Sequence, residues 1–209
     1  MTNILKAKDI YFSYKKGDII NGASFEITSG INLLLGENGS GKSTLMKILG
    51  GIYKASSGEI YLNDISYKDE LEIKKNIGYV PQKFNSFQNI KVEEYLSFIS
   101  SFNDHGNIDL TLLEIDNFKD KYMRELSEGM QKRVLVAAAL SLNPKVILAD
   151  EPTSGLDKNG RIKLRKLFSI INEKFPEKII IFSSHLDEDI YDDVNFIYEV
   201  KNGKVIKYD

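Results

Sequence analysis

Cysteine is absent from this sequence of 209 residues, so the chain has no disulfide bonds and no zinc–thiolate sites. Long apolar runs are absent too: stretches such as 31–35 and 134–140 are far shorter than the roughly 18 apolar residues of a membrane-spanning helix. Residues 1–9 are polar and charged, unlike a secretory signal peptide. The sequence therefore predicts a cytoplasmic protein that depends on another chain wherever a membrane has to be crossed.

An excess of one charge is also missing. The 28 Lys and Arg residues nearly balance the 30 Asp and Glu residues, which leaves a formal charge of −2, and no basic tract stands out. We therefore expect no nucleic acid partner. The hydrophobic fraction of 42%, with 11 Phe and 11 Tyr, is sufficient for a packed core in one domain of this length.

Short apolar runs alternate with helical patterns along the chain. Strands are expected at 10–14, 24–27, 31–35, 59–62, 65–67, 77–80, 146–149, 179–182, 194–200 and 204–208. Helices are expected at 42–49, 129–140 and 161–175. The continuous apolar runs are typical of strands that a parallel sheet buries on both faces. The predicted fold class is α/β, with a mostly parallel sheet and an antiparallel β subdomain formed by the early strands.

The pattern changes to helical between residues 85 and 122. There Val92, Tyr95, Leu96, Ile99 and Phe102 recur at helical spacing, which indicates an inserted α-helical subdomain. We expect one domain over 1–209, in which 1–84 and 140–209 form the α/β core and 85–139 form the helical subdomain.

A glycine-rich loop follows the apolar run 31–35. It matches the phosphate-binding P-loop through Gly36, Glu37, Asn38, Gly39, Ser40, Gly41, Lys42, Ser43 and Thr44. Its backbone amides and the following helix can surround phosphate oxygens, Lys42 can reach the terminal phosphates, and Ser43 can bind Mg²⁺. The alternative is an ordinary turn with an exposed lysine, but the strand before and the helix after favour a nucleoside triphosphate. Kinases and GTPases share this loop, although the guanine-reading N-K-x-D motif is absent here.

Four further segments follow in order. They are YVPQ ending at Gln82, LSEGMQ beginning at Leu126, VILADEPTSGLD from 146 to 157, and His185 after an apolar run. Together with the P-loop they resemble the ABC ATPase family over most of the chain. The resemblance implies a P-loop NTPase core that binds and hydrolyses ATP, with ATP and Mg²⁺ as cofactors.

The resemblance also implies roles for individual residues. Glu151 is expected to be the general base that activates water, and His185 to contact the γ-phosphate and support Glu151, with Lys42 as a further catalytic residue. Asp150 ends an apolar strand at the carboxyl edge of the sheet, where it can hold Mg²⁺ together with Ser43 and Gln82. There are simpler alternatives for each of these residues. Asp150 and Glu151 could be two solvated acids, His185 an ordinary surface or core histidine, and Gln82 an ordinary loop amide. The other histidine, His105, is expected to be an ordinary loop residue.

Tyr14 stands where the family stacks an aromatic ring on adenine, although packing against the sheet is an alternative. Ser127 and Gly129 precede a helix and, by resemblance, face the γ-phosphate bound by a partner subunit; a structural helix cap is the alternative. Glu128 and Met130 depart from the commonest family pattern of glycine and glutamine. A carboxylate near phosphates weakens such a half-site unless it points away.

In this interpretation each chain holds half of two catalytic sites, so activity needs a two-fold, head-to-tail dimer of identical or different chains. Ser154, Leu156 and Asp157 would line that interface. The expected function is that of an ATP-binding subunit that powers a separately encoded transmembrane transporter subunit, with export favoured, from the inner face of the cell membrane. Phe84 and Phe87 are candidates for docking that subunit, or else they anchor the loop. A non-transport ABC ATPase acting in complex assembly or on ribosomes or nucleic acid is the alternative function.

Overall fold

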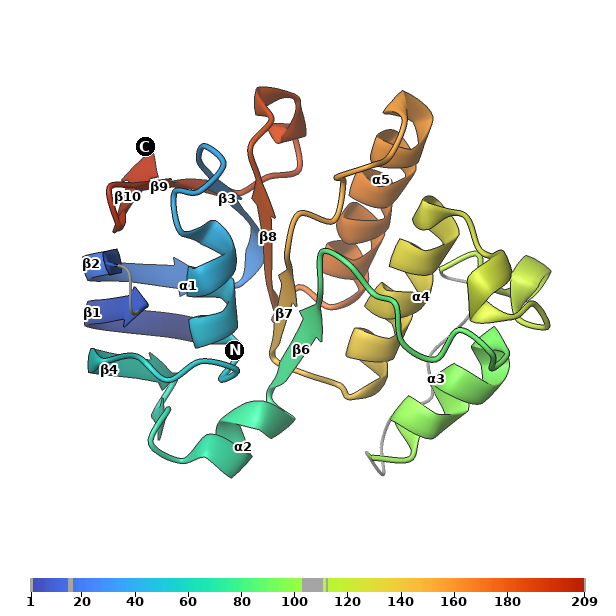
Figure 1. Cartoon of the computed structure of the whole chain (residues 1–209), viewed down its shortest axis with the longest axis horizontal. Coiled ribbons are helices and arrows are strands. Elements are labelled where there is room, and N and C mark those ends of the chain that lie inside the picture. The colour runs from blue at the N-terminus through green and yellow to red at the C-terminus, as the bar shows by residue number, and fades with distance from the viewer. Residues whose placement is uncertain (1, 15–16, 103–110, 112, 209) are drawn as a thin grey trace.

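Two β-sheets form one half of the molecule in the computed structural model, which describes residues 2–14, 17–102, 111 and 113–208 (Figure 1). His105 lies outside the described residues. The smaller sheet is antiparallel in the order β2-β1-β4-β5: β1 is Ile4–Tyr14, β2 Gly17–Thr28, β4 Ser57–Leu62 and β5 Ile65–Ser66. The larger sheet has the order β10-β9-β3-β8-β7-β6: β3 is Gly30–Leu35, β6 Ile77–Val80, β7 Val146–Ala149, β8 Ile179–Ser184, β9 Phe196–Lys201 and β10 Lys204–Tyr208.

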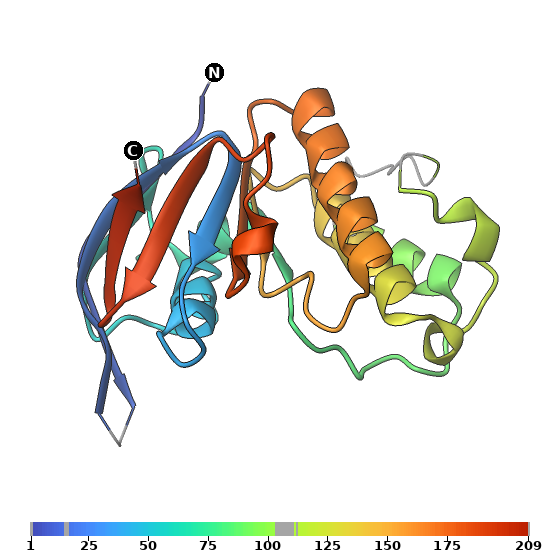
Figure 2. The ribbon, with the colours of Figure 1, turned by 90° about the horizontal axis from the view of Figure 1, so that it is seen from above.

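The larger sheet is parallel from β9 to β6, and only the edge strand β10 runs antiparallel to its neighbour. The helices are α1 Lys42–Leu49, α2 Glu70–Lys75, α3 Val92–Ser100, α4 Glu128–Ser141 and α5 Lys158–Lys174, and 3₁₀ turns occur at Asp116–Phe118, Met123–Glu125 and Asp187–Asp189. Seen from above, α3, α4 and α5 lie on the side of the molecule away from the antiparallel sheet (Figure 2).

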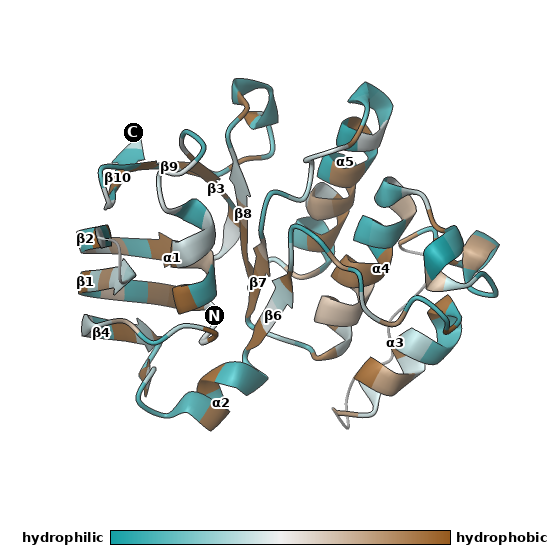
Figure 3. Cartoon of the chain, viewed as in Figure 1, coloured by the Kyte–Doolittle hydropathy of each residue, from teal (hydrophilic) through white to brown (hydrophobic). Residues whose placement is uncertain are grey.

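The larger sheet separates two hydrophobic cores because its side chains alternate between its faces. Ile147 and Ala149 of β7, for example, pack among α4 and α5, whereas Val146 and Leu148 pack among α1 and the antiparallel sheet. Strand β7 is accordingly apolar along its length (Figure 3). Because the central strands are buried on both faces, the loops at their carboxyl ends are held in fixed positions relative to one another.

The fold class predicted from the sequence is confirmed. Strands β1 and β2 are longer than expected because shifts of register, such as the one between Ala7 and Ile10, interrupt the alternation of apolar side chains. The helical pattern was expected from residue 85, but α3 begins only at Val92. The preceding loop contains Phe87 at a φ of 56°, which a helix does not allow. Helix α2 was not expected.

Candidate active site

Four neighbouring parallel strands end at one edge of the larger sheet, and each is followed by a residue that the sequence singled out. The order is β3, β8, β7 and β6, and the loops that follow them carry Lys42, His185, Asp150 with Glu151, and Gln82. Carboxyl ends of parallel strands are where ligands bind in open α/β folds. The structure therefore brings together side chains that lie more than 100 residues apart in the sequence, such as Ser43 and Asp150.

The glycine-rich loop is shaped by two close approaches. A Cβ atom on Gly36 would lie 2.6 Å from the Val200 carbonyl oxygen, so only glycine fits there. Gly41 adopts a left-handed φ of 104° and caps α1, and its carbonyl accepts a hydrogen bond from the amide of Leu45 (2.8 Å). These constraints direct the amino-terminal end of α1 towards the loop, where a helix favours an anion.

Lys42 is buried beneath this loop. Its Nζ donates to the carbonyl oxygens of Gly36 (2.7 Å) and Glu37 (2.9 Å) and lies 4.0 Å from Oε1 of Glu151. Burial lowers the pKa of Lys42, while the charges of Glu151 and Asp150 act in the opposite direction. The ammonium group therefore has two backbone carbonyl oxygens and one carboxylate oxygen of the same chain around it.

Asp150 is the buried centre of a hydroxyl cluster. Its Oδ1 accepts hydrogen bonds from Ser43 Oγ and Ser183 Oγ, each at 2.9 Å, and its Oδ2 accepts one from the Tyr79 hydroxyl at 3.3 Å. Burial first, and then the charge of Asp150, raise the pKa of Tyr79. Ser183 and Tyr79 were not predicted, although the pairing of Ala149 with Phe182 on adjacent strands places Ser183 beside Asp150.

Glu151 lies next to Asp150 in the chain but makes different contacts, because its backbone has a left-handed φ of 41°. Its amide donates to Ser183 Oγ (2.9 Å), and its Oε2 accepts a hydrogen bond from Gln82 Nε2 at 2.8 Å. The same Oε2 is 3.7 Å from Nδ1 of His185, which is exposed. A non-glycine residue in this region of φ is strained, and such strain is concentrated at functional sites.

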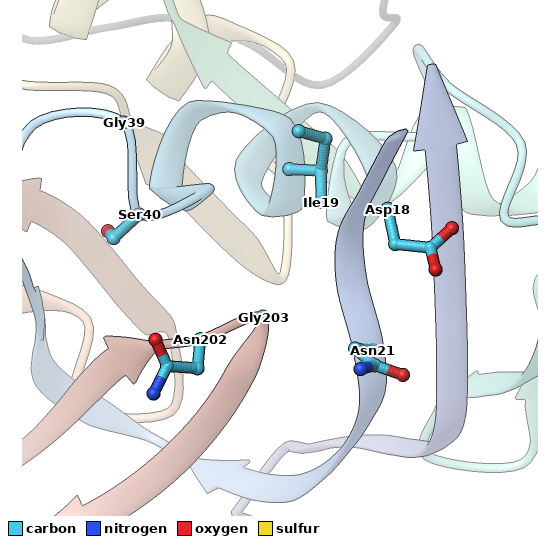
Figure 4. Close-up of a pocket in the computed structure, with 7 residues that line it drawn as sticks. All are labelled: Asp18, Ile19, Asn21, Gly39, Ser40, Asn202 and Gly203. Atoms are coloured by element: carbon cyan, nitrogen blue, oxygen red, sulfur yellow. The ribbon is translucent and has the colours of Figure 1, made fainter. Parts of the chain in front are cut away.

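Several cavities in the described part of the chain flank the loop. The first, of about 250 Å³, is lined by Ile19, Gly39, Gly41, Lys42, Ser43, Thr44 and Glu151. The second, of about 320 Å³, lies between the loop, strand β2 and the turn from β9 to β10, and Figure 4 shows Ser40 and Asn202 on the side of it that faces away from Asp18. The first cavity is lined by both Lys42 and Glu151.

Tyr14 lies beside this first cavity, in an aromatic group with Phe12 and Tyr53. Its ring meets Phe12 edge-on at 5.0 Å and Tyr53 edge-on at 6.1 Å, and Phe12 stacks on Tyr53 at 5.5 Å. A hydrogen bond with the Thr44 side chain, the largest influence, lowers the pKa of Tyr14. Tyr14 is 43% exposed, so part of the residue remains accessible to a ligand.

The residues around the start of α4 contact the loop that follows Glu151. Ser127 caps α4 by accepting a hydrogen bond from the amide of Met130 (3.3 Å), and a Cβ on Gly129 would lie 3.8 Å from Leu156. The Glu128 carboxylate is in close contact with Gly155. Asp157 caps α5 through the amide of Gly160 (2.7 Å), and the Ser154 amide donates to the carbonyl of Glu151 (3.1 Å).

Two buried charged residues near the site were missed by sequence reasoning. Lys132 lies on α4 and donates to the carbonyls of Pro81 (3.2 Å) and Gln82. Asp189, in the 3₁₀ turn after His185, accepts hydrogen bonds from Thr153, Ser184 and Arg165. Both lie in charged stretches of sequence that are typical of solvated surface, so no signal in the pattern marks them.

Comparison with known proteins gives consistent relatives. A family model described as ABC transporter matches residues 20–154. The energy-coupling factor transporter ATP-binding protein EcfA2 of Clostridioides difficile is 34% identical over 188 residues, which cover 82% of this chain and 65% of that protein. The corresponding EcfA1 of Streptococcus agalactiae is 31% identical over 98% of this chain and 78% of its own length. This chain therefore spans about two thirds to four fifths of these relatives.

Solved structures agree. The cbiO1 protein of Clostridium perfringens, part of the ABC transporter complex cbiONQ, superposes with a TM-score of 0.85 at 31% identity over 99% of this chain and 88% of its own. The dimeric ATP-binding cassette MJ0796, bound to ADP and phosphate, gives a TM-score of 0.83 at 28% identity over 98% and 97%.

The expectation of export is not supported by these comparisons. The relatives at 31–34% identity are named as energy-coupling factor transporter proteins, whereas an Atm1-family ABC exporter is only 22% identical and shares the fold alone. Within the described part of the chain, no helix has the length and apolar character needed to span a bilayer. The sequence motifs, the convergence of their residues at one sheet edge and these relatives together show that the chain belongs to the ABC transporter family, as one of its ATP-hydrolysing cassettes.

Proposed function

We propose that this chain binds ATP with Mg²⁺ at the carboxyl edge of its larger sheet and hydrolyses it as one half of a dimer that powers a transporter of the energy-coupling factor type. The single observation that supports this most strongly is the contact set of Glu151. Its carboxylate accepts a hydrogen bond from Gln82 Nε2 (2.8 Å) and lies 3.7 Å from His185 Nδ1 and 4.0 Å from Nζ of Lys42, the lysine of the phosphate loop. A carboxylate held by an amide, an imidazole and an ammonium group is suited to accept a proton from water.

The residues present fit the triphosphate. The loop amides, the amino-terminal end of α1 and Lys42 all favour phosphate oxygens. Among the described residues, the buried Ser40 hydroxyl has no hydrogen-bond partner, so the loop holds a donor that a phosphate oxygen could engage. Tyr14 is the proposed contact for the adenine ring, because its exposed ring lies next to Thr44 at the end of the loop.

The residues also fit Mg²⁺. Ser43 Oγ and Asp150 Oδ1 are 2.9 Å apart, and both are hard oxygen ligands of the kind that Mg²⁺ prefers. In the described residues no group of three or more acidic or histidine side chains forms a complete metal cage. This agrees with a cation that keeps water molecules and binds phosphate oxygens, with Gln82 as a further ligand. When bound, Mg²⁺ would neutralise charge on the phosphates.

We assign the chemistry to the chain as follows. Glu151 accepts a proton from the attacking water, Gln82 orients its carboxylate, and His185 contacts the γ-phosphate and supports Glu151. Lys42 exchanges its contacts with the carbonyls of Gly36 and Glu37 for contacts with the terminal phosphates.

The dimer is proposed because the start of α4 has no contact with its own phosphate loop in the described hydrogen bonds; it contacts its own loop 151–157 instead. Ser127 is exposed and Gly129 partly so, which leaves a hydroxyl and a helix amino terminus for an anion on another chain. Ser154 and Asp157 would lie at the same interface. Related cassettes at 28–29% identity have been solved as dimers.

A membrane subunit is proposed to dock on an exposed aromatic strip. Phe87, Phe98 and Phe102 are 46%, 47% and 68% exposed, and neighbouring rings along the strip lie 5.1–6.3 Å apart, with Phe84 and Tyr95 behind them. Adjoining exposed rings of this kind mark an interaction site on a soluble surface. The strip begins at Phe84, two residues after Gln82, so the chain connects a docked subunit to Gln82 through a short segment. This would place the chain on the cytoplasmic face of the membrane and leaves 85–139 as the proposed helical subdomain.

Glu151→Gln tests the proposal. The variant should bind ATP, lose 10²- to 10⁴-fold in kcat because a positioned base contributes about that much, and accumulate as a dimer with ATP and Mg²⁺. Hydrolysis is measured by phosphate release and mass by light scattering after gel filtration. Lys42→Ala, which should not bind ATP, is the negative control. A Glu151→Gln chain that stays monomeric at saturating ATP and Mg²⁺ contradicts the dimer mechanism.

A further inference from the structure

A lysine is buried where α4 meets the loop after β6. Lys132 is 5% exposed, and its Nζ donates to the carbonyl oxygens of Pro81 at 3.2 Å and of Gln82. The preceding residue, Gln131, donates from Nε2 to the carbonyl of Phe84 at 3.1 Å. Two consecutive residues of one helix therefore hold the backbone of segment 81–84, which has no regular secondary structure of its own.

The geometry accounts for the placement of this ammonium group. A buried ammonium group is costly unless its donors are used, and here two adjacent backbone carbonyls accept them. No neutral side chain of this length offers several donors to two adjacent carbonyls.

We propose that Lys132 is a positioning residue for hydrolysis: its ammonium group fixes the Pro81–Gln82 backbone, so that the Gln82 amide is presented to Glu151. The contacts run from α4 through Lys132 to the Gln82 carbonyl, and from the Gln82 side chain to Glu151 Oε2 at 2.8 Å. Lys132 does not touch the proposed reacting atoms. Its effect on the reaction passes through Gln82.

The placement of Lys132 has a second consequence, which rests on the proposed function. Ser127 is five residues earlier at the start of the same helix, a distance of about 8 Å at 1.5 Å per residue. A helix is rigid over that length, so Lys132 attaches the Gln82 loop to the element that presents Ser127 and Gly129 to the partner chain. A shift of α4 on dimer closure would therefore move Gln82, whose side-chain amide donates to Glu151.

The chain provides a matched control. Lys178 is also buried, at 4% exposed, and donates to the carbonyl of a proline, Pro144, at 2.6 Å and to Asn143 Oδ1 at 3.0 Å. It precedes β8, at the edge of the sheet opposite the catalytic residues. Lys178→Met removes a buried ammonium group of the same kind without touching segment 81–84.

The first measurement is NMR relaxation of the backbone amides of the ligand-free chain. Lys132→Met should lower the order parameters at 82–85 to below about 0.6, the range of flexible backbone, while Lys178→Met leaves them unchanged, because only the first variant releases that backbone. Equal order parameters at 82–85 in wild type and Lys132→Met overturn the inference. If the methionine variant does not fold, Lys132→Leu, which also lacks a donor, is judged by the same criterion.

The second measurement is a double-mutant cycle on kcat with Gln82→Ala. Lys132→Met should lower kcat about tenfold to hundredfold, with KM for ATP changed less than about threefold, because misplacement of a catalytic group acts on the transition state. The double variant should be no slower than Gln82→Ala alone, whereas Lys178→Met should combine additively with Gln82→Ala. Additive effects of Lys132→Met and Gln82→Ala overturn the inference. A wild-type chain that does not hydrolyse ATP contradicts the proposed function instead, and the relaxation measurement still decides whether Lys132 holds the loop.

Discussion

Replacing Asp189 with asparagine should destabilise the protein strongly, although the acidic run Asp187–Asp189 has the composition of an exposed segment, where such a change costs little. The side chain is fully buried: Oδ2 accepts hydrogen bonds from Thr153 Oγ1 (2.7 Å) and Ser184 Oγ (2.5 Å), and Oδ1 accepts two from Arg165 (2.6 and 3.1 Å). Asparagine keeps the shape and an acceptor for Arg165, but it loses the charge. The asparagine NH₂ group would also face the hydroxyls of Thr153 and Ser184, which donate hydrogen bonds to Oδ2 in the wild type.

The magnitude follows from these contacts. Breaking a buried ion pair costs about 3–5 kcal/mol when one partner keeps its charge. The hydroxyls of Thr153 and Ser184 can rotate to accept from the new amide, which recovers part of this loss, so we expect a decrease in unfolding free energy of about 2–4 kcal/mol. For a chain of this size Tm falls by roughly 2–4 °C per kcal/mol, so Tm should drop by about 5–15 °C.

Urea denaturation followed by circular dichroism measures the free energy, and differential scanning fluorimetry measures Tm. The adjacent Glu188 provides the control, because its ion pair with Arg161 (2.9 Å) is formed by a side chain that is 75% exposed. Glu188→Gln should cost less than about 1 kcal/mol. If Asp189→Asn unfolds at the same urea concentration as Glu188→Gln, the buried network does not stabilise the fold as we reason.

Two further predictions concern binding surfaces. Tyr14→Ala should weaken ATP binding about threefold to tenfold while leaving kcat within about twofold, because loss of one stacking contact costs about 1 kcal/mol and stacking on the base binds the ground state and the transition state equally. Titration calorimetry should show Tyr14→Phe close to wild type, and an unchanged alanine variant would exclude adenine stacking. The pair Phe87→Ala and Phe98→Ala should abolish co-purification with a polytopic membrane protein from native membranes, while ATP affinity stays within error and Tm falls by only a few degrees, because about half of each side chain is exposed and the rest packs on neighbouring rings. Retained co-purification would place the docking surface elsewhere.

Much of the site could be predicted because short sequence motifs and the ends of apolar runs identify its residues. Helix α1 begins at Lys42 as expected, since the phosphate-loop pattern that ends in Gly41, Lys42 and Ser43 marks that boundary in the sequence. The ends of β6 and β7 also fall where continuous apolar runs stop, so Gln82 and Asp150 could be placed at one sheet edge before any coordinates.

The remaining features depend on contacts that no local pattern contains. Asp189 belongs to the acidic run Asp187–Asp189, which has the composition of solvated surface, and only packing against Arg165 and Thr153 buries it. Lys132 lies in a helix with charged neighbours, and its burial depends on where the loop after β6 happens to pass. The start of α3 was misplaced because the apolar repeat itself begins only at Val92, and the loop before it contains Phe87 with a left-handed φ of 56° that a helix does not adopt.

The order of strands in the larger sheet also has a consequence for biosynthesis. Strand β3, which leads into the phosphate loop, is flanked by β8 on one side and β9 on the other, and both come from residues 179–201. Until those residues have left the ribosome, β3 has neither neighbour, and its apolar side chains and backbone groups stay unpaired. Contacts between segments so far apart in sequence form slowly. A nascent chain that has already synthesised its nucleotide loop must therefore wait for almost 150 further residues, a period in which chaperones would have to shield β3 from aggregation.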